Sequence, residues 1–527
     1  MRNRKFLLIF LVLILSAFII GCSSKDEEAN GSDQGTAVDD TEASGKLDIA
    51  FHLTLPQLDP HMTTDIGVRD VSIHIYEGLL AVNGDMEIVP MLAESYEESE
   101  DGKQITFNLR QGIKFHNEKE MKAEDVVASL NRWQKMSTQA KNYISDVTFE
   151  EVDEYTVVAN VPNPSIMTLA VIASYNQFPA IMPKEVVEAV GEDRIEEVIG
   201  TGPYKLEEFR QDQYVHITKY DEYQAREEAP GGLAGEKKAQ VKDLYFHIVP
   251  DISTRIAGIQ SGEYDVATSI PHDSVDQLEQ ADNIDIQITR TPWDDAVLNK
   301  KGKFQDIKLR QAVNAALDKE ALLLAAYGNE EYFELNHSLV PAEQTDWLSD
   351  AGKDIYETYD PELAKQLLDE AGYDGEEIIL LSSQERKYLY DMSVVAQEQL
   401  KNIGMNVKLE NTDWATFITD IGDENAWDMY LGTLGYNPVI TEALFWNPNW
   451  YGWHDSEEMN EVVEDVLRAG TVENAAQYTD DLHQVFYDYL PVIKIGDGSQ
   501  LIATNSNLDG FIYHMTSGVY WNISKNE

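Results

Sequence analysis

The residue types that perform catalysis are abundant in this chain, but they do not fall into the spacings that enzymes use. The 527 residues include 11 histidines, 94 acidic residues and one cysteine. The sequence contains no His-Glu-x-x-His zinc motif, no Gly-x-Ser-x-Gly nucleophile turn, and neither a phosphate-binding nor a dinucleotide-binding glycine loop. We therefore predict no catalytic residue and no cofactor. An enzyme stays open as an alternative, because the lack of a motif does not exclude one.

Three histidines near the start of the chain are close enough in sequence to suggest a metal site. These are His52, His61 and His74, and Asp65 follows His61 at the spacing of one helical turn. Either a metal site or ordinary packed histidines fits this arrangement. Because no other segment shows the spacing of metal ligands, we predict ordinary histidines and no metal. Carboxylate pairs are too numerous in so acidic a chain to single out one that could hydrolyse a glycoside.

The single cysteine, Cys22, follows a segment that is typical of exported proteins. A basic start leads into an apolar run over 6–20, and Gly21 precedes the cysteine. This run is shorter than the roughly 20 apolar residues that cross a membrane. The sequence Ile19-Ile20-Gly21-Cys22 resembles the bacterial lipobox, which implies cleavage before Cys22 and acylation of its sulfur and new amino group. We predict a lipoprotein signal peptide over 1–21; an uncleaved anchor is the alternative.

Length and composition indicate a large exported protein with more than one lobe. Residues 22–45 are polar and acidic without apolar periodicity, which predicts a disordered tether. The rest of the chain is too long for one simple core, and hydrophobic residues make up 43% of the sequence. A chain with one cysteine can form no internal disulfide.

The net charge of −54 disfavours two classes of partner. So negative a field repels nucleic acid and anionic membrane surfaces, so we predict no nucleic-acid partner. The acidity suits a surface that stays solvated in a saline or alkaline exterior. Steering of cationic ligands is the alternative explanation.

Strand-like and helix-like segments alternate after the tether, which predicts an α/β fold. Alternating apolar residues predict strands over 46–51, 105–109, 156–161 and 407–410. Helical periodicity and glycine stops predict four helices, over 123–133, 306–327, 361–371 (ended by Gly372) and 389–403 (ended by Gly404).

Many short segments, taken in order, resemble the extracellular solute-binding proteins of ABC importers, family 5, in the dipeptide- and oligopeptide-binding group that also includes nickel binders. The resemblance covers nearly all of the chain after the tether. The matching segments are Leu58-Asp-Pro60, Glu77-Gly-Leu-Leu80, Pro90-Met-Leu-Ala-Glu-Ser95, Asp101-Gly102, Phe107 to His116, Ala123-Glu-Asp-Val126, Gly200-Thr-Gly-Pro-Tyr204, Ser253-Thr-Arg255, Ser261-Gly-Glu-Tyr-Asp265, Leu309 to Asp318 and Tyr359 to Tyr373.

We expect most of these motifs to have structural roles in the fold and not to contact the ligand. Gly202 and Pro203 are suited to a tight turn before a strand. Arg110 lies between a strand and a glycine, where we expect a structural ion pair. Asp125 lies near a helix start, where its charge meets the helix dipole favourably.

The resemblance implies two α/β lobes of the periplasmic-binding-protein type, with an extra inserted domain and a ligand cleft between the lobes. Two crossings of the chain would join the lobes and act as a hinge. The implied boundaries are 46–76, 199–288 and 494–527 for the first lobe, 77–198 for the inserted subdomain, and 289–493 for the second lobe.

The resemblance also points to residues that would hold the two ends of a ligand. The carboxylate-binding arginine of dipeptide binders precedes a helix as Arg-x-Tyr, and Arg386-Lys-Tyr388 has that spacing. A solvated cation at a helix start is the alternative. Peptide binders hold the ligand amine with an aspartate after Gly-Trp-x-Gly. Here Thr433 stands in place of the tryptophan and Tyr436 in place of the aspartate, so Tyr436 and Asn437 are the expected contacts.

Aromatic residues are dense in the expected second lobe, and most of them are expected to pack in the core. A cleft that takes varied ligands favours aromatic walls with few polar anchors. We predict that Trp293, beside Asp294, lines the cleft together with Trp414 and Trp446.

The resemblance therefore implies a substrate-binding lipoprotein that captures peptides and delivers them to the transmembrane subunits of a permease. Nickel chelates, opine-like compounds and oligosaccharides stay open as ligands, and an exported enzyme or a ligand-free sensor stays open as another class of protein. We expect a monomer, held by lipid on Cys22 at the outer face of the cell membrane of a Gram-positive organism.

Overall fold

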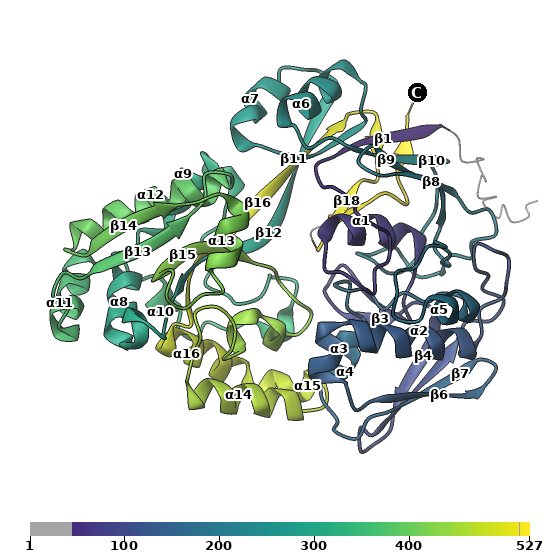
Figure 1. The fold of residues 1–527 in the computed structure, drawn as a ribbon, viewed down its shortest axis with the longest axis horizontal. Coiled ribbons are helices and arrows are strands. Elements are labelled where there is room, and N and C mark those ends of the chain that lie inside the picture. Colours follow the sequence, from purple (N-terminus) through teal and green to yellow (C-terminus); the bar gives the residue numbers. More distant parts are fainter. Residues whose placement is uncertain (1–44, 516, 527) are drawn as a thin grey trace, which may run out of the picture. The chain divides into compact units, whose positions relative to one another are not determined.

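A ten-stranded mixed sheet organises the structure, a computed structural model that describes residues 45–515 and 517–526. The strand order is β14-β13-β15-β12-β16-β11-β1-β10-β9-β8. The two long strands in the middle, β12 (Ile284–Leu298) and β16 (Val492–Asn505), pair antiparallel with each other. Figure 1 shows them running between two groups of strands. We call the part that contains β1 and β8–β11 the first lobe, and the part that contains β13–β15 the second lobe.

The first lobe is built on β1 (Lys46–Phe51), which pairs parallel with both β10 and β11. Five of its six residues are buried, as expected for a strand with other elements on both faces. The strand predicted over 46–51 is confirmed. The other elements of this lobe are β8 (Tyr204–Arg210), β9 (Tyr214–Lys219), β10 (Asp243–Ile248), β11 (Val266–Ile270), α1 (Ile66–Ile75), α6 (Ile252–Ser261), η1 (His272–Ser274), α7 (Val275–Leu278), and the short pairs β17 (Leu508–Asp509) with β20 (Ser524–Lys525) and β18 (Ile512–His514) with β19 (Ser517–Val519). A short antiparallel pair, β2 (Leu80–Val82) with β3 (Ile88–Pro90), follows α1 in the sequence.

A separate four-stranded antiparallel sheet lies between α1 and β8 in the sequence, and we call it with its helices the inserted subdomain. Alternate residues of its central strands are buried, which matches the alternation in the sequence. Its elements are β4 (Ala93–Glu98), β5 (Gln104–Leu109), β6 (Thr148–Asp153), β7 (Thr156–Asn160), α2 (Ala123–Met136), α3 (Thr138–Tyr143), α4 (Met167–Ile172) and α5 (Lys184–Val190).

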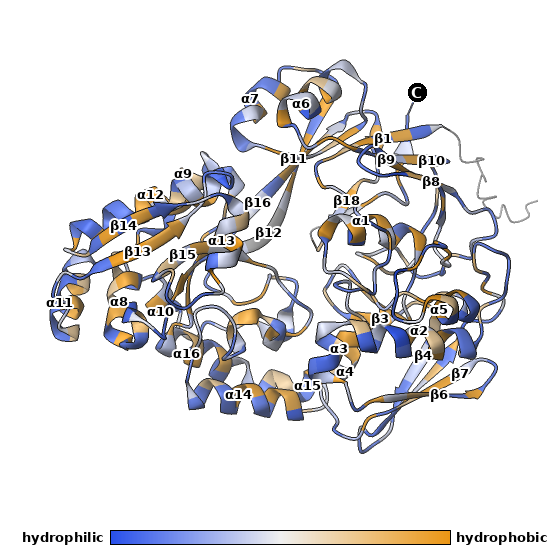
Figure 2. Cartoon of the chain, in the orientation of Figure 1, coloured by the Kyte–Doolittle hydropathy of each residue, from blue (hydrophilic) through white to orange (hydrophobic). Residues whose placement is uncertain are grey.

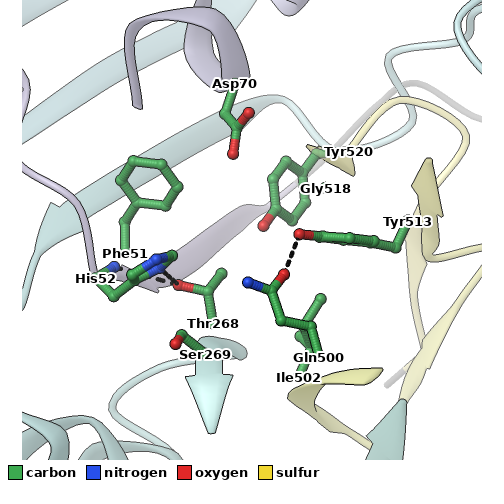
Figure 3. A pocket seen from close by; sticks show the side chains of 10 residues that line it. All are labelled: Phe51, His52, Asp70, Thr268, Ser269, Gln500, Ile502, Tyr513, Gly518 and Tyr520. Atoms are coloured by element: carbon green, nitrogen blue, oxygen red, sulfur yellow. Dashed lines mark hydrogen bonds between the residues drawn. The ribbon is translucent and has the colours of Figure 1, made fainter. Parts of the chain in front are cut away.

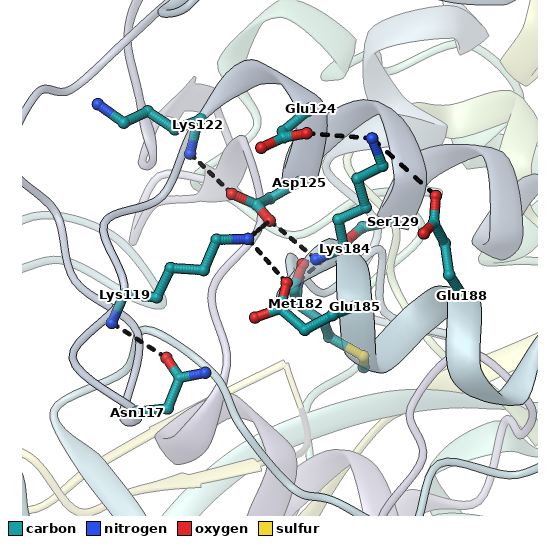
Figure 4. Close-up of polar contacts among 10 residues, drawn as sticks. All are labelled: Asn117, Lys119, Lys122, Glu124, Asp125, Ser129, Met182, Lys184, Glu185 and Glu188. Carbon is teal, nitrogen blue, oxygen red and sulfur yellow. Dashed lines mark hydrogen bonds and ion pairs between the residues drawn. The ribbon is translucent and has the colours of Figure 1, made fainter.

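Asp125 anchors the start of α2 and joins it to α5 (Figure 4). Its buried carboxylate accepts hydrogen bonds from the backbone N–H of Lys122 at 2.9 Å and of Lys184 at 2.8 Å. The ammonium of Lys119 lies 2.7 Å from the same carboxylate. The predicted place of this carboxylate at a helix start is confirmed, and its contacts are structural.

Arg110 differs from its prediction. Its Nη2 donates hydrogen bonds to the carbonyls of Gln224 at 2.8 Å and Ala225 at 3.1 Å. It forms no ion pair with any residue that the structure describes, so the expected ion pair is wrong. The guanidinium holds the loop before β10 through carbonyl groups instead.

The Gly200-Thr-Gly202 turn passes very close to the end of α1. A Cβ atom on Gly200 would lie 2.1 Å from the carbonyl oxygen of Ile75, and one on Gly202 would lie 2.6 Å from that of His74. Only glycine fits such contacts. β8 then begins at Tyr204, directly after Pro203, as the turn predicts.

The second lobe contains parallel strands flanked by helices. β13 (Glu377–Ser382) pairs parallel with β14 (Asn406–Asn411) and with β15 (Met429–Leu434). Its other elements are α8 (Ile307–Ala316), α9 (Lys319–Tyr327), α10 (Lys353–Tyr356), α11 (Pro361–Ala371), α12 (Lys387–Asn402), α13 (Trp414–Asp420), α14 (Glu457–Arg468), α15 (Val472–Ala475), α16 (Thr479–Tyr489), η2 (Lys303–Gln305), η3 (Glu330–Tyr332), η4 (Thr345–Trp347), η5 (Ile440–Glu442), η6 (Leu444–Trp446) and η7 (Ala476–Tyr478).

The single helix predicted over 306–327 is wrong, because the segment forms α8 and α9. Leu317 is extended, and the side chain of Asp318 accepts a hydrogen bond from the backbone N–H of Ala321. Aspartate is a favoured N-cap, so Asp318 starts a new helix inside an otherwise helical pattern. The helix predicted over 361–371 has the observed bounds of α11, and α12 begins two residues before its prediction.

Hydrophobic residues follow the faces that these elements bury. In Figure 2, α12 and α14 carry both hydrophilic and hydrophobic stretches, as helices with one buried face do.

The inserted subdomain contacts the second lobe where the N–H of Ile166 donates to the carbonyl of Leu467 at 3.2 Å. Within the described residues, no helix has the length and apolar character needed to cross a membrane.

Candidate ligand-binding site

A pocket lies in the first lobe where the parallel strands β1 and β11 end (Figure 3). Ligands of open α/β sheets bind outside the carboxyl ends of such strands. The end of β1 contributes Phe51 and His52, and β11 contributes Thr268 and Ser269. Among the other residues that line the pocket are Gln500, Ile502, Tyr513 and Tyr520.

Polar groups converge on this pocket. A ring nitrogen of His52 lies 2.9 Å from the hydroxyl of Thr268, and the hydroxyl of Tyr513 donates to the side-chain carbonyl of Gln500. Burial, together with the positive charges of Arg255 and Arg386, lowers the pKa of His52 to about 4. The imidazole is therefore neutral near pH 7, and the charge of Arg386 in the second lobe acts on a residue of this pocket.

Ser269 holds a backbone conformation that is unusual for a residue with a side chain. Its φ is 53°, in the left-handed region, and Nη2 of Arg255 donates a 3.0 Å hydrogen bond to its carbonyl. Such conformations persist where the surroundings enforce them, and they gather at binding sites. The Ser253-Thr-Arg255 motif thus shapes the pocket without lining it.

Arg386 and Trp414 form a cationic ledge in the second lobe. Arg386 is the exposed N-cap residue of α12, and its guanidinium carbon lies 4.7 Å from the ring centre of Trp414. Trp414 in turn stacks on Phe417 at 4.9 Å. Among the described residues Arg386 has no acidic partner within ion-pair distance, so its guanidinium is available to an external anion.

Tyr388 follows Arg386 by two residues in α12, and its ring centre lies 6.1 Å from that of Tyr327. Burial raises its pKa to about 12, and the charge of Asp294 adds to the rise. The hydroxyl of Tyr388 also bonds to Thr433. It is therefore a neutral phenol at physiological pH.

A buried charged cluster surrounds the point where β12, β15 and β16 meet. The ammonium of Lys494 lies 3.0 Å from Oδ1 of Asp497 and 3.2 Å from the hydroxyl of Tyr436. Nδ2 of Asn336 donates to the other oxygen of Asp497 at 2.7 Å. The structure thus brings the predicted contact Tyr436 into a group with two charged residues of β16.

The neighbouring aspartates of β12 are also buried. Tyr327 donates a 2.7 Å hydrogen bond to Oδ2 of Asp294, and Oδ1 has no hydrogen-bond partner. Burial raises the pKa of Asp294 well above its usual range. Neither oxygen of Asp295 has a hydrogen-bond partner, and burial raises the pKa of this carboxyl to about 8.

The remaining predicted contacts lie at different depths. Trp293 is 1% exposed, with its ring 4.7 Å from the ammonium of Lys494. Trp446 is 3% exposed, and its indole N–H donates to the carbonyl of Ile440. Asn437 is half-buried, and its amide donates to the carbonyl of Gly435. Trp293 therefore adjoins the Lys494 cluster, while Trp446 packs behind Phe445.

The three early histidines go to separate places. His61 contacts the carbonyl of Ala180 and the guanidinium of Arg132, whereas His74 contacts the carbonyl of Asp70 and the N–H of Tyr520. In the part of the chain that the structure describes, no three His, Cys, Asp or Glu residues gather as metal ligands would.

Sequence reasoning missed Lys494, Asp497 and Gln500. Each is a polar residue of β16, which is buried along nearly its whole length. Buried polar residues are costly unless they are paired, but the mixed composition of this strand gives no sequence signal of its burial. The predicted lipidation site, Cys22, and the predicted signal peptide lie outside the described residues.

A comparison with protein families gives the arrangement its context. The model of the bacterial extracellular solute-binding proteins, family 5 (middle part), matches residues 87–455. This chain belongs to that family. The family 5 protein is 27% identical over 497 residues to the probable peptide ABC transporter periplasmic-binding protein y4tO of Sinorhizobium fredii, covering 89% of this chain and 92% of that one.

Solved structures share the fold of this family 5 protein. Oligopeptide-binding AppA from Bacillus subtilis, in complex with a nonapeptide, has a TM-score of 0.73 and 21% identity and covers 91% of this chain and 98% of its own. AgaA from A. tumefacien R10, in complex with agropinic acid, has a TM-score of 0.74 and 22% identity and covers 92% and 99%. The predicted two-lobe α/β fold is confirmed.

Members of this family are extracytoplasmic binding proteins that work with the permease subunits of ABC importers and bind peptides or small solutes. They are binding proteins and not enzymes, so the prediction of a non-enzyme is confirmed. The family 5 protein is a substrate-binding protein of an ABC importer.

Proposed function

We propose that this protein captures dipeptides or longer peptides in the cleft between its lobes and delivers them to its permease. The observation that carries this proposal is Arg386, a guanidinium without an acidic partner among the described residues, stacked on Trp414. A guanidinium binds a carboxylate through two parallel hydrogen bonds, and every unblocked peptide ends in a carboxylate.

The other predicted contacts surround this cation in the proposal. Tyr388 and Asp294 would border the ligand on the second-lobe side, with Tyr436 and Asn437 at its other end. Trp293 and Trp446 would support these residues from behind, because both are almost fully buried. An apolar wall with a few polar anchors suits peptides of varied sequence.

Closure of the lobes would trap the ligand. We place the hinge in β12 and β16, the strands that contain the predicted crossings near 289 and 493. A ligand that touches both lobes only when they are closed shifts the population toward that state. The proposed boundaries are 46–76, 199–288 and 494–527 for the first lobe, 77–198 for the inserted subdomain and 289–493 for the second lobe.

The proposed anchor is lipid on Cys22, after removal of residues 1–21, with 22–45 as a tether. Two or more acyl chains hold a protein at a membrane stably, whereas one chain does not. The protein would act as a monomer at the outer face of a Gram-positive cell membrane. Replacement Cys22→Ala should release the protein into the medium, and retention at the membrane would count against the lipid anchor.

The test of the ligand is mass spectrometry of solutes released from the purified protein by gentle denaturation. We expect peptides with free carboxyl ends, and the same peptides should raise the melting temperature of the ligand-free protein. If no member of a broad peptide panel raises it, the peptide assignment is wrong. Turnover of a bound solute by the pure protein would instead support an exported enzyme.

A second candidate ligand is an opine-like compound, because AgaA of the same fold holds agropinic acid. Such a compound would also present a carboxylate to Arg386. Its mass among the released solutes would decide for this class. Nickel chelates and oligosaccharides would be recognised in the same spectrum.

A further inference from the structure

Lys494 is a buried cation in the middle of the candidate site. Its side chain has no exposed surface, and burial lowers its pKa. A lysine is almost never fully buried unless its ammonium is paired. The contacts of this ammonium therefore show which groups of the site bind a positive charge.

The contacts of Lys494 match those of a site for an ammonium ion. Nζ donates hydrogen bonds to the carbonyl of Ser338 and to the hydroxyl of Tyr436, and it pairs with Oδ1 of Asp497 at 3.0 Å. Two hydrogen bonds and one ion pair therefore hold this ammonium, which has three donors. The rings of Trp293 and Tyr436 lie 4.7 and 5.5 Å from Nζ, within the range of cation–π attraction. We call the four residues around this ammonium, Ser338, Tyr436, Trp293 and Asp497, the ammonium cage.

The cage has no capacity left for a second ammonium. The second oxygen of Asp497 accepts the amide of Asn336 at 2.7 Å. Its first oxygen, Oδ1, forms the ion pair with Lys494. A positively charged ligand group beside Tyr436 would meet the charge of Lys494. The nearby carboxyl of Asp294 is a poor counter-charge, because burial raises its pKa well above its usual range.

The cage also lies close to the pocket of the first lobe along one strand. Asp497 and Gln500 both belong to β16, and Gln500 lines the pocket. Three residues of a strand span roughly 10 Å, and side chains three positions apart leave opposite faces of it. The cage and the pocket are therefore neighbours along β16.

We propose that Lys494 supplies from within the chain the ammonium that a free-amine ligand would bring. The cleft then selects solutes that present a carboxylate to Arg386 and carry no ammonium at the end beside Tyr436. N-acylated or N-cyclised peptides are the chemical class that fits. This inference rests on the proposed peptide function.

The first test compares a mixture of tripeptides that have free amines with the same mixture after N-acetylation, by competition in native mass spectrometry. The wild-type protein should bind the acetylated mixture at least as well. Lys494→Met leaves Asp497 without its cation, so the preference should move toward free amines by about tenfold, which corresponds to one charge-assisted pair. The double variant Lys494→Met/Asp497→Asn should lose this gain.

The matched control is Lys300→Met. Lys300, in the second lobe, is a buried lysine as Lys494 is, but its ammonium donates to the carbonyls of Leu298 and Pro491 and has no part in the cage. This variant should keep the wild-type preference. A wild-type protein that prefers free amines about tenfold, or a Lys494→Met variant with the wild-type ratio, would overturn the proposal.

If the wild-type protein binds neither mixture, the peptide function falls, and a second measurement decides the role of Lys494. In Lys494→Ala, propylammonium chloride should raise the melting temperature saturably, whereas propanol and sodium chloride should not. Lys494→Ala/Asp497→Asn should show no such rise. If Lys494→Ala does not fold, the same measurement uses Lys494→Met with ammonium chloride, because that variant lacks only the terminal nitrogen of the lysine. A missing rise in the single variant overturns the proposal.

Discussion

The guanidinium of Arg132 lies 2.6 Å from a carboxylate oxygen of Asp59, and both side chains are buried. A second contact of 3.2 Å joins the other oxygen of Asp59 to Nη1 of Arg132. This pair ties the Leu58-Asp-Pro60 loop to α2, so it joins the first lobe to the inserted subdomain. The Leu58-Asp-Pro60 motif therefore serves folding and not ligand binding.

Asp59→Asn should destabilise the protein strongly. The variant leaves the charge of Arg132 buried without its carboxylate, a loss that typically lowers the free energy of unfolding by about 3–5 kcal/mol. Urea unfolding followed by circular dichroism measures it. Glu208→Gln is the control, because Glu208 pairs with Arg210 at the exposed surface, where such pairs contribute little to stability. Equal losses in the two variants would contradict the structural role of Asp59.

Gly200→Ala should lower the melting temperature. The new Cβ would lie 2.1 Å from the carbonyl oxygen of Ile75, so the turn or the end of α1 must shift. Overpacking of this kind reduces the free energy of unfolding by about 1–3 kcal/mol or more. Gly435→Ala is the control, because no atom lies within 4 Å of the Cβ that it would add. Differential scanning calorimetry should separate the two variants, and an unchanged Gly200→Ala protein would refute the close approach.

Asp295 predicts a particular dependence of stability on pH. Its carboxyl ionises near pH 3.8 in the unfolded chain, whereas burial raises its pKa to about 8 in the folded protein. Between these values the folded state keeps a proton that the unfolded state has lost, so stability falls as the pH rises. The loss is about 1.4 kcal/mol per pH unit for one proton.

Asp295→Asn removes this titration. The free energy of unfolding of the variant minus that of the wild type should therefore rise by about 1.4 kcal/mol per pH unit from pH 4 to pH 8. Above pH 8 this difference should be constant. Urea titrations at pH 5, 6, 7, 8 and 9 measure it. A gap that does not change between pH 5 and 8 would show that Asp295 is ionised in the folded state.

Arg386→Ala should weaken the binding of a peptide carboxylate. The loss of one charged hydrogen-bonded pair corresponds to about 10- to 100-fold in dissociation constant. Amidation of the peptide carboxyl should weaken binding to the wild type equally and should have no further effect on the variant. Calorimetry with both peptides on both proteins forms a complete cycle.

Lys387→Ala is the control for Arg386. Lys387 is the next residue along the chain and is exposed, but its ammonium already pairs with Asp391. Its removal should leave affinity unchanged. Equal effects at 386 and 387 would indicate general electrostatic attraction in place of a specific anchor.

Local structure was readable from the sequence where the signal is itself local. The strand over 46–51 and the helix over 361–371 follow from the spacing of apolar residues, a proline at the helix start and a glycine at its end. The sequence pattern does not show the break between α8 and α9, because Asp318 caps α9 inside a continuous helical pattern. Whether an aspartate there caps a new helix or continues the first one depends on tertiary packing.

The sequence by itself determined the family and the place of Arg386. Ordered motifs and the Arg-x-Tyr spacing are properties of the chain, and they need no knowledge of which segments meet. Only the tertiary structure decided that Tyr436 meets Lys494 and Asp497. These residues lie about sixty positions apart along the chain, and their contact depends on the antiparallel pairing of β12 with β15 and β16. Burial then makes that contact strong, because a charge removed from water must find its partner inside the protein.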